Sequence, residues 1–416
     1  MSRRTARYPR ARGSSPGGFA RLWAAVGISN LGDGVASAAL PLLAAALTRD
    51  PALVAGLTFA QQLPWLLFAL PAGAIVDRSD RRVLMWRTDA VRGLALVAFG
   101  LLVALDQGTL ALLYALAFAL GVGETLFDTS YRSLLPNLVA SVELERANAR
   151  LYGVEIVANR FAGPPLGGLL FGAAASAPFF LDAGSFLLAA VAVFAIGGRF
   201  RAASVGTGSV PFRTTVAEGL RWLAAHRLLR SLAIVVSVWH LVWAAGNAIL
   251  VLYAQELLGL GSAGYGVLLA AGAVGSVAGS LVASRLAVRL GRARALAGSV
   301  ALAALAQLGI AMTSSPVVAA VALAVSGLCA VVWNVITVAL RQRLAPDELL
   351  GRVNGAYRFA AMGSVALGAL LGGALASIEL RLPFIVAAAT LVVTAVSLML
   401  VIRDPVHLNP SRSSYG

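Results

Sequence analysis

Long apolar stretches recur along almost the whole chain, and they constrain its fold more than any other feature. Windows long enough to cross a membrane as helices lie near residues 20–47, 52–76, 83–105, 109–129, 148–172, 177–197, 230–256, 264–288, 293–313, 316–340, 354–377 and 383–402. Only 12% of the 416 residues are charged, whereas a soluble protein has roughly 25%. The pattern therefore predicts an all-α membrane protein with twelve transmembrane helices.

A polar stretch separates the first six windows from the last six. The expected organisation is a cytoplasmic N-tail at 1–19, a six-helix bundle at 20–197, a cytoplasmic linker at 198–229, a second six-helix bundle at 230–402 and a cytoplasmic C-tail at 403–416. Within the linker, a Gly- and Ser-rich part is typical of a flexible chain. Its second part has an apolar stripe, which predicts an amphipathic helix on the inner membrane surface. A linker helix packed on the bundle fits that stripe equally well.

The positions of the basic residues predict the orientation, and all 33 of them are arginines. If both termini are cytoplasmic, the two tails and the loops after the even-numbered windows hold 29 of the 33. An excess of positive charge is the signature of cytoplasmic loops. We therefore predict a multi-pass protein of a bacterial cytoplasmic (inner) membrane, with membrane lipid around it. The same placement explains the net charge of +15 without nucleic acid as a partner.

Composition argues against an enzyme and against a metal protein. The single cysteine, Cys329, excludes an internal disulfide and a cysteine-based metal site. The three histidines are scattered, and the chain has no lysine for a phosphate-binding loop. We expect no catalytic residues, no metal and no cofactor. The chain also has no ATP-binding motif, so we expect no step driven by ATP hydrolysis.

The segment Pro71–Arg82 ends an apolar window in a dense group of charges. Asp77 and Arg81 are four residues apart, so on a helix they share a face and can pair. Gly73 lies one turn before Asp77 and permits another helix to approach closely. A simple stop-transfer cluster at a helix end is the alternative explanation.

These residues resemble the loop 2–3 signature of the major facilitator superfamily. Its fixed positions are occupied by Gly73, Asp77, Arg78, Arg81 and Arg82, while Asp80 stands where the family usually has glycine. Asp tolerates a left-handed backbone better than most residues, so the turn is expected to survive. The resemblance implies that Asp128 completes a charge relay with Asp77 and Arg81, which latches the outward-facing state.

Other segments resemble one branch of that superfamily, the macrolide-efflux and enterobactin-exporter-like proteins. They are Ile28–Asp33, Leu126–Tyr131 and Glu218–Arg221. The resemblance implies a major facilitator fold of two six-helix halves that exports an amphipathic organic molecule in exchange for protons.

An internal repeat accompanies this pattern. Gly163-Pro-Pro-Leu-Gly-Gly168 matches Gly368-Ala-Leu-Leu-Gly-Gly373 six windows later, as two related halves predict. Pro164 is expected to kink its helix, and Gly163, Gly167 and Gly168 permit tight helix contact. The segment is also similar to the span-5 motif of the superfamily's antiporters, which is taken to seal an exporter against leak. Ordinary packing of small residues is the alternative.

Ionisable side chains within the windows are the candidates for proton coupling, because they usually face a cavity or one another. Asp33 is the first choice, since flanking glycines leave it accessible and burial favours the protonated form of a carboxyl group. A permanent pair with an arginine is the alternative. Asp89 and Arg92, three residues apart, predict a structural ion pair, with Arg92 also acting on Asp33. Further candidates are Glu124, Glu155 and Asp182.

Aromatic and amide side chains are the candidates for the substrate wall, because ligand cavities are mostly apolar with a few polar anchors. The set is Asn30, Gln61, Gln62, Trp239, Trp243, Asn247, Tyr253, Trp333 and Asn334. For the tryptophans near window ends, anchoring at the membrane interface is the alternative.

Together these features predict a monomeric secondary active transporter that exports amphipathic small molecules, such as a drug, antibiotic or siderophore, by proton antiport with alternating access. Three other functions stay open. An importer on the same fold would have a more polar cavity. A flippase for lipids or lipid-linked precursors would move labelled lipid without requiring protons. A receptor or assembly partner would bind a ligand without transporting it.

Overall fold

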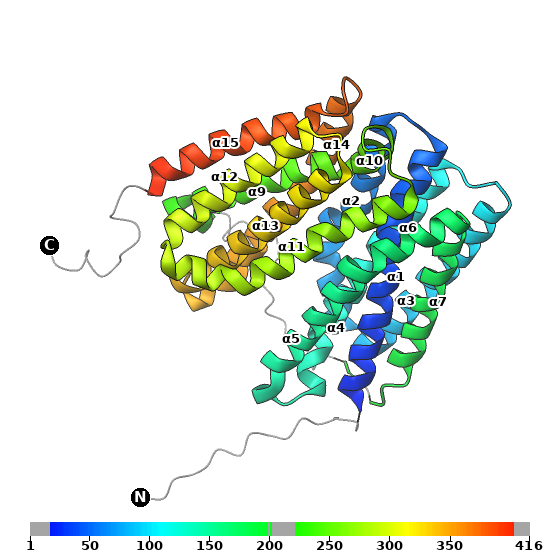
Figure 1. Cartoon of the computed structure of the whole chain (residues 1–416). Coiled ribbons are helices and arrows are strands. Elements are labelled where there is room, and N and C mark those ends of the chain that lie inside the picture. The colour runs from blue at the N-terminus through cyan, green and yellow to red at the C-terminus, as the bar shows by residue number, and fades with distance from the viewer. Residues whose placement is uncertain (1–16, 199, 202–220, 403–416) are drawn as a thin grey trace, which may run out of the picture.

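A computed structural model describes residues 17–198, 200–201 and 221–402 of the chain. Figure 1 shows two groups of helices, one from each half of the sequence. The first contains α1 (Gly18–Leu47), α2 (Pro51–Arg78), α3 (Arg81–Ala104), α4 (Leu110–Leu138), η1 (Ser141–Glu143), α5 (Leu144–Glu155), η2 (Ile156–Ala162), α6 (Gly163–Ala173) and α7 (Ala177–Phe194). The second contains α9 (Arg227–Ala248), α10 (Leu250–Glu256), α11 (Ser262–Arg289), α12 (Arg292–Met312), α13 (Pro316–Leu344), α14 (Asp347–Ala376) and α15 (Leu382–Ile402).

Local sequence explains where several of these helices begin. Asp50 caps α2 by accepting a 2.8 Å hydrogen bond from the backbone N–H of Ala52. Pro51 occupies the first helical position, where its lack of a backbone N–H leaves no donor unsatisfied. Thr109 caps α4 in the same way through the N–H of Leu112. These caps satisfy backbone donors at helix ends that no helical carbonyl can reach.

The twelve predicted membrane-spanning helices are confirmed. Within the described residues, ten helices are long and apolar enough to cross a membrane by length and composition. The eleventh is α3, whose first half is rich in charged side chains. The twelfth is the continuous run of α5, η2 and α6, in which the π-helical segment η2 lies between two α-helical pieces.

Among the described residues, the apolar cores show that the two halves share a core at one end of the molecule. We call the end at which α1 begins the arginine-rich end, because most arginines lie near it, and the other end the opposite end. One core cluster joins residues of both halves, such as Leu57 and Tyr265, toward the opposite end. Toward the arginine-rich end each half has its own core, with Met85 in one and Leu296 in the other. Figure 1 shows the halves diverging accordingly.

The repeated glycine segments occupy equivalent positions in the two halves. In the first half, Gly163 lies against the backbone of Gly34 and Gly167 against that of Val35, both on α1. In the second half, the counterparts lie against α9, Gly368 at Leu241 and Gly372 at Ala245. Each segment therefore packs on the first helix of its own half.

The last glycine of each segment contacts a helix of the other half. Gly168 on α6 lies against the backbone of Ser262 on α11, and Gly373 on α14 lies against Ala52 on α2. A side chain at either glycine would collide with the facing helix. These two contacts are related by the repeat and bring the halves together at the opposite end.

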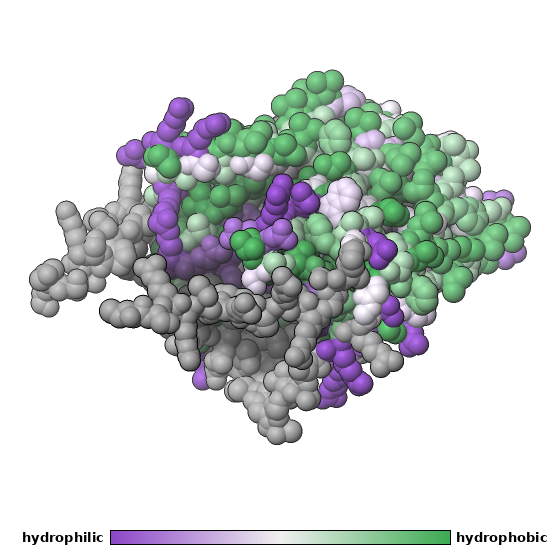
Figure 2. Space-filling view, turned by 90° about the horizontal axis from the view of Figure 1, so that it is seen from below, coloured by the Kyte–Doolittle hydropathy of each residue, from purple (hydrophilic) through white to green (hydrophobic). Residues whose placement is uncertain are grey.

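Polar contacts close the same end, and the arginine-rich end is open. Arg49 donates a 2.6 Å hydrogen bond to Oε1 of Gln255 and lies 3.9 Å from the carboxylate of Glu256. On α2, by contrast, an added Cβ at Gly73 would meet no atom within 4 Å. Figure 2 shows the molecule from this side, with a hollow at which hydrophilic side chains gather.

The predicted N-tail and C-tail, and residues 202–220 of the linker, lie outside the described residues. The end of the linker is described: residues 221–225 are helical, and Leu223 is 4% exposed within the core of the second half. This part of the linker packs on the second bundle.

Candidate functional site

The guanidinium of Arg92 is the centre of a buried charged cluster in the first half. Arg92 on α3 is 4% exposed and donates from Nη2 a 2.7 Å hydrogen bond to Oδ1 of Asp33 on α1. Its Nη1 lies 3.8 Å from Oδ1 of Asp89. The guanidinium also stacks 3.8 Å from the ring centroid of Phe186 on α7. One cation thus joins three helices, and its shorter contact is to Asp33.

Two further carboxyl groups of this cluster are almost fully enclosed. Asp89 and Asp182 are 0% and 1% exposed. Ser185 donates a 3.4 Å hydrogen bond to Oδ1 of Asp182, whereas Asp182 Oδ2 and both oxygens of Asp89 accept none. Gly32 permits this packing, because a side chain there would collide with Asp182 and Ser185. Asp33, Asp89 and Asp182 therefore surround a single arginine.

A pocket of about 130 Å³ lies beside the cluster and is lined in part by Asp33 and Arg92. Its lining residues come from α1, α3, α4, α5 and η2: Ser29, Asn30, Asp33, Arg92, Glu124, Phe127, Asp128, Glu155, Asn159 and Arg160. Glu124 is exposed and Asp33 is 24% exposed. Most of the predicted proton-coupling residues thus line one pocket, while Asp89 and Asp182 are enclosed behind it.

A π-helical segment forms one wall of this pocket. In η2, the backbone of Asn159 lies so close to Gly34 on α1 that a side chain at Gly34 would collide with it. The segment ends just before Pro164, which has no N–H to continue the helical hydrogen bonds. The kink expected at Pro164 therefore takes the form of π-helical turns, which are frequent at functional sites.

The predicted relay of Asp77, Arg81 and Asp128 is not formed in this conformation. Asp77 is exposed and takes part in none of the ion pairs of the described residues. Arg81 instead donates a 3.0 Å hydrogen bond to the carbonyl of Ser133. Asp128 pairs at 3.3 Å with Arg132, one turn along its own helix.

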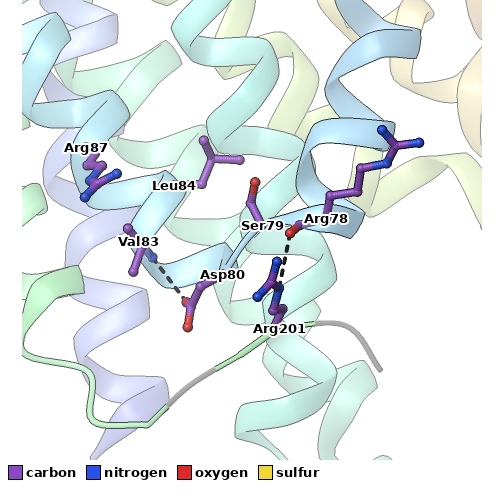
Figure 3. A pocket seen from close by; sticks show the side chains of 7 residues that line it. All are labelled: Arg78, Ser79, Asp80, Val83, Leu84, Arg87 and Arg201. Carbon is purple, nitrogen blue, oxygen red and sulfur yellow. Dashed lines mark hydrogen bonds between the residues drawn. The ribbon is translucent and has the colours of Figure 1, made fainter. Parts of the chain in front are cut away.

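The expectation of a left-handed turn at Asp80 is wrong. Asp80 has φ −73° and ψ 114°, and its Oδ1 caps α3 by accepting from the N–H groups of Arg82 and Val83. Its Oδ2 accepts a 3.1 Å hydrogen bond from the N–H of Phe200. Figure 3 shows Asp80 turned toward Val83 and Arg201 reaching the carbonyl of Arg78. An aspartate here joins the loop to residues 200–201, which glycine cannot do.

The two remaining signature arginines also contact the end of the first half. Arg82 donates a 2.6 Å hydrogen bond to the carbonyl of Ile196. Arg78 is exposed, and its backbone carbonyl accepts from Arg201 at 3.3 Å. The signature thus fastens the α2–α3 loop to the end of the first half in this conformation.

Several candidates for the substrate wall lie inside the second half. Trp239 and Trp333 are 7% and 3% exposed, with ring centroids 5.9 Å apart. Tyr253 is fully buried, its ring centroid lies 4.8 Å from that of Phe384, and its hydroxyl donates to the carbonyls of Ile310 and Thr313. In this conformation these three side chains pack in the core and face no opening.

The other wall candidates lie nearer to surfaces. Trp243 is 41% exposed, and Asn334 is exposed on α13. Asn247 is half-buried just before the break between α9 and α10, and its carbonyl accepts from the N–H of Ile249. Gln61 and Gln62 are half-buried on α2. Asn30 donates a 2.8 Å hydrogen bond to the carbonyl of Val26 and lines the pocket described above.

Two arginines that the charge count assigned to a loop lie on helices of the second half. Arg358 on α14 lies 4.9 Å from the ring centroid of Trp65 on α2, so the contact spans the two halves. Arg341 on α13 is 7% exposed and lies 3.7 Å from the ring centroid of Tyr357. Hydropathy could not reveal these contacts, because each partner lies on a different helix.

Known proteins share this sequence and this fold. Residues 15–413 match the family described as transmembrane secretion effector. The multidrug efflux pump Tap of Mycobacterium tuberculosis is 30% identical over 86% of this chain and 85% of its own length. An uncharacterized major facilitator transporter of Sinorhizobium fredii is 26% identical over 94% of this chain and 96% of its own.

Solved structures with lower sequence identity share the fold. A bacterial homologue of the human lysosomal transporter Spinster, inward-facing and occupied, has a TM-score of 0.75 at 13% identity, over 92% of this chain and 96% of its own. A bacterial homologue of the iron transporter ferroportin, also inward-facing, has a TM-score of 0.70 at 18% identity, over 92% and 98%. The chain therefore belongs to the transmembrane secretion effector family of multi-pass major facilitator transporters.

Proposed function

We propose that this transporter exports amphipathic small molecules across the bacterial cytoplasmic membrane in exchange for protons. The observation that supports it most directly is the pocket in which Asp33 is paired with Arg92 and Glu124 is exposed. Carboxyl groups enclosed within a membrane bundle are suited to bind and release protons, because their charged form is costly there.

The arginines support an orientation of the protein in the membrane. The halves diverge at the arginine-rich end, and positive charge is retained on the cytoplasmic side. We therefore assign this conformation as inward-facing, open to the cytoplasm. The 30% identity to a multidrug efflux pump over most of both chains supports export of drug-like molecules.

In the proposed cycle, the Asp33–Arg92 pair at 2.7 Å belongs to the state that has released its proton to the cytoplasm. Substrate enters the opening between the halves from that side. The halves then rock about the midplane, so that the opposite end opens and the arginine-rich end closes. A proton from outside neutralises Asp33, weakens its hold on Arg92 and accompanies release of substrate.

Transport in inverted membrane vesicles tests this proposal. A fluorescent amphipathic cation such as ethidium is added with and without an imposed pH gradient, acid inside, for wild type, Asp33→Asn and Asp106→Asn. Asp106 is the matched control, because it is exposed in the α3–α4 turn with φ 57°, which Asn also adopts. Gradient-driven uptake is expected for wild type and the control and loss of uptake for Asp33→Asn.

Two results would overturn the proposal. Uptake by wild type that ignores the pH gradient would exclude proton antiport, and full uptake by Asp33→Asn would remove Asp33 from it. The same vesicles with labelled lipid distinguish a flippase, which would translocate lipid without a pH gradient.

A further inference from the structure

A second group of buried polar side chains lies in the other half of the protein, apart from the carboxyl cluster. Trp333, Thr337 and Arg341 follow one another at intervals of four residues and so share one face of α13. Tyr357 of α14 packs against them, with its ring 3.7 Å from the guanidinium of Arg341 and its hydroxyl beside all three side chains. Trp333, Arg341 and Tyr357 are only 3%, 7% and 8% exposed.

These side chains include hydrogen-bond donors that have no well-formed partner. Trp333 Nε1, Arg341 Nε and Nη1, and the hydroxyl of Tyr357 are all enclosed, and none makes a well-formed hydrogen bond. The indole and the guanidinium can only donate. The hydroxyl of Thr337 donates to the carbonyl of Trp333 and makes no well-formed hydrogen bond with these donors. Buried donors of this kind usually indicate an ion or water that completes the site.

The cluster also carries a positive charge that has no ion-pair partner among the described residues. Arginine remains charged in proteins, and Arg341 belongs to none of the ion pairs of the described residues. Of the acidic residues of the second half, Glu256 ends α10 and Glu379 follows α14 at the opposite end, whereas Asp347 and Glu348 begin α14. The tyrosine ring stabilises the cation in part, but it leaves the N–H groups unpaired.

We propose that Trp333, Arg341 and Tyr357 form a binding site for a compact monovalent anion, such as chloride or a small carboxylate. A single negative charge balances the one guanidinium, whereas a dianion would leave a net charge in the bundle. The burial of all three side chains restricts the ligand to a few atoms. The converging N–H and O–H donors suit an acceptor without hydrogens of its own.

Anion exchange at constant ionic strength tests the site. The full-length protein in detergent is prepared in sodium gluconate, whose anion is too large for the site, and gluconate is replaced stepwise by chloride, iodide or acetate. A bound anion raises the midpoint of thermal unfolding in a saturable way. Iodide is also expected to quench tryptophan fluorescence saturably, because it would contact Trp333. A response to chloride identifies an inorganic anion, and a response to acetate alone identifies a carboxylate.

Matched variants connect the response to these residues. Arg341→Gln is expected to abolish it, whereas Arg343→Gln removes the same charge from an exposed position two residues along α13 and is expected to retain it. Trp333→Phe and Tyr357→Phe keep the arginine and each remove one donor, so each is expected to raise the half-saturating concentration about ten-fold. These two variants decide the question if Arg341→Gln does not fold.

The proposal is overturned if wild type shows no saturable response to any of the three anions. It is equally overturned if the responses of Trp333→Phe and Tyr357→Phe match that of wild type. The double variant Asp347→Asn/Glu348→Gln is expected to keep the response, because the ligand comes from solution and not from these neighbouring carboxyl groups.

Discussion

Gly168 on α6 packs against the backbone of Ser262 on α11, so that two helices from different halves touch with no side chain between them. The repeat produces an equivalent contact, in which Gly373 on α14 packs against Ala52 on α2. These contacts, with Arg49 and Gln255, hold the opposite end closed.

Gly168→Ala is expected to open that end. The added methyl group would overlap the carbonyl of Ser262, and overpacking of this kind costs about 1–3 kcal/mol, which changes the ratio of two conformations roughly 5- to 150-fold. Spin labels at Asp106 and Glu379, exposed at the same end in different halves, measure the separation in a Cys329→Ala background. The distance distribution is expected to shift to longer values.

The control for that experiment is Gly184→Ala, because a Cβ at Gly184 meets no atom within 4 Å. It should leave the distances unchanged. Equal distributions for Gly168→Ala and wild type would show that this contact does not determine the conformation.

Arg92→Gln is expected to destabilise the first half strongly. It leaves Asp33, Asp89 and Asp182 without their shared cation, and the loss of one partner of a buried pair costs about 3–5 kcal/mol. Arg160→Gln, which removes an exposed arginine from the same pocket, should have a much smaller effect. Thermal unfolding of the purified proteins measures both. Adding Asp33→Asn to Arg92→Gln should restore part of the lost stability, and a double variant less stable than Arg92→Gln would contradict the pairing.

The contact of Arg358 with Trp65 is expected to couple the two halves weakly in this conformation. Cation–π contacts at exposed sites contribute about 0.5–1 kcal/mol. A double-mutant cycle with Arg358→Gln and Trp65→Leu measures the coupling from thermal unfolding. Strictly additive effects of the two substitutions would exclude an interaction across the interface.

Asp77→Asn is expected to impair transport without lowering the stability of this conformation. Asp77 is exposed and Gly73 faces open space here, so their contribution belongs to the state in which the arginine-rich end is closed. Asp80→Ala provides the contrast, because loss of the α3 cap costs about 1 kcal/mol and the hydrogen bond to Phe200 is lost as well. Vesicle transport and thermal unfolding are measured for both variants. A large fall in the stability of Asp77→Asn would contradict this assignment.

Most of the proton-coupling candidates could be found from the sequence, because a charged residue within an apolar window is conspicuous. Asp33, Glu124, Glu155 and Arg92 indeed line one pocket. The partner of Arg92 could not be deduced in the same way. Spacing favoured Asp89 on the same helix, whereas the closer carboxylate is that of Asp33, 2.7 Å away on α1.

In the second half too, contacts between different helices could not be deduced from the sequence. The count of loop arginines grouped Arg341 and Arg358 with the loop after the tenth window. Arg341 is instead buried beside Tyr357, and Arg358 contacts Trp65 in the other half. Conversely, Trp239, Trp333 and Tyr253 suggested a substrate wall, although they pack in the core of this conformation.

The sequence by itself determined the number of helices, their division into two related halves and the end at which arginines gather. Those features depend on local quantities, namely the length of an apolar segment relative to the bilayer and the charge of the residues beside it. Only the tertiary structure decided which carboxylate reaches Arg92, which glycines join the halves and which end is open. The reason is that each of these contacts connects helices far apart in the chain, and their positions are fixed by packing across the bundle.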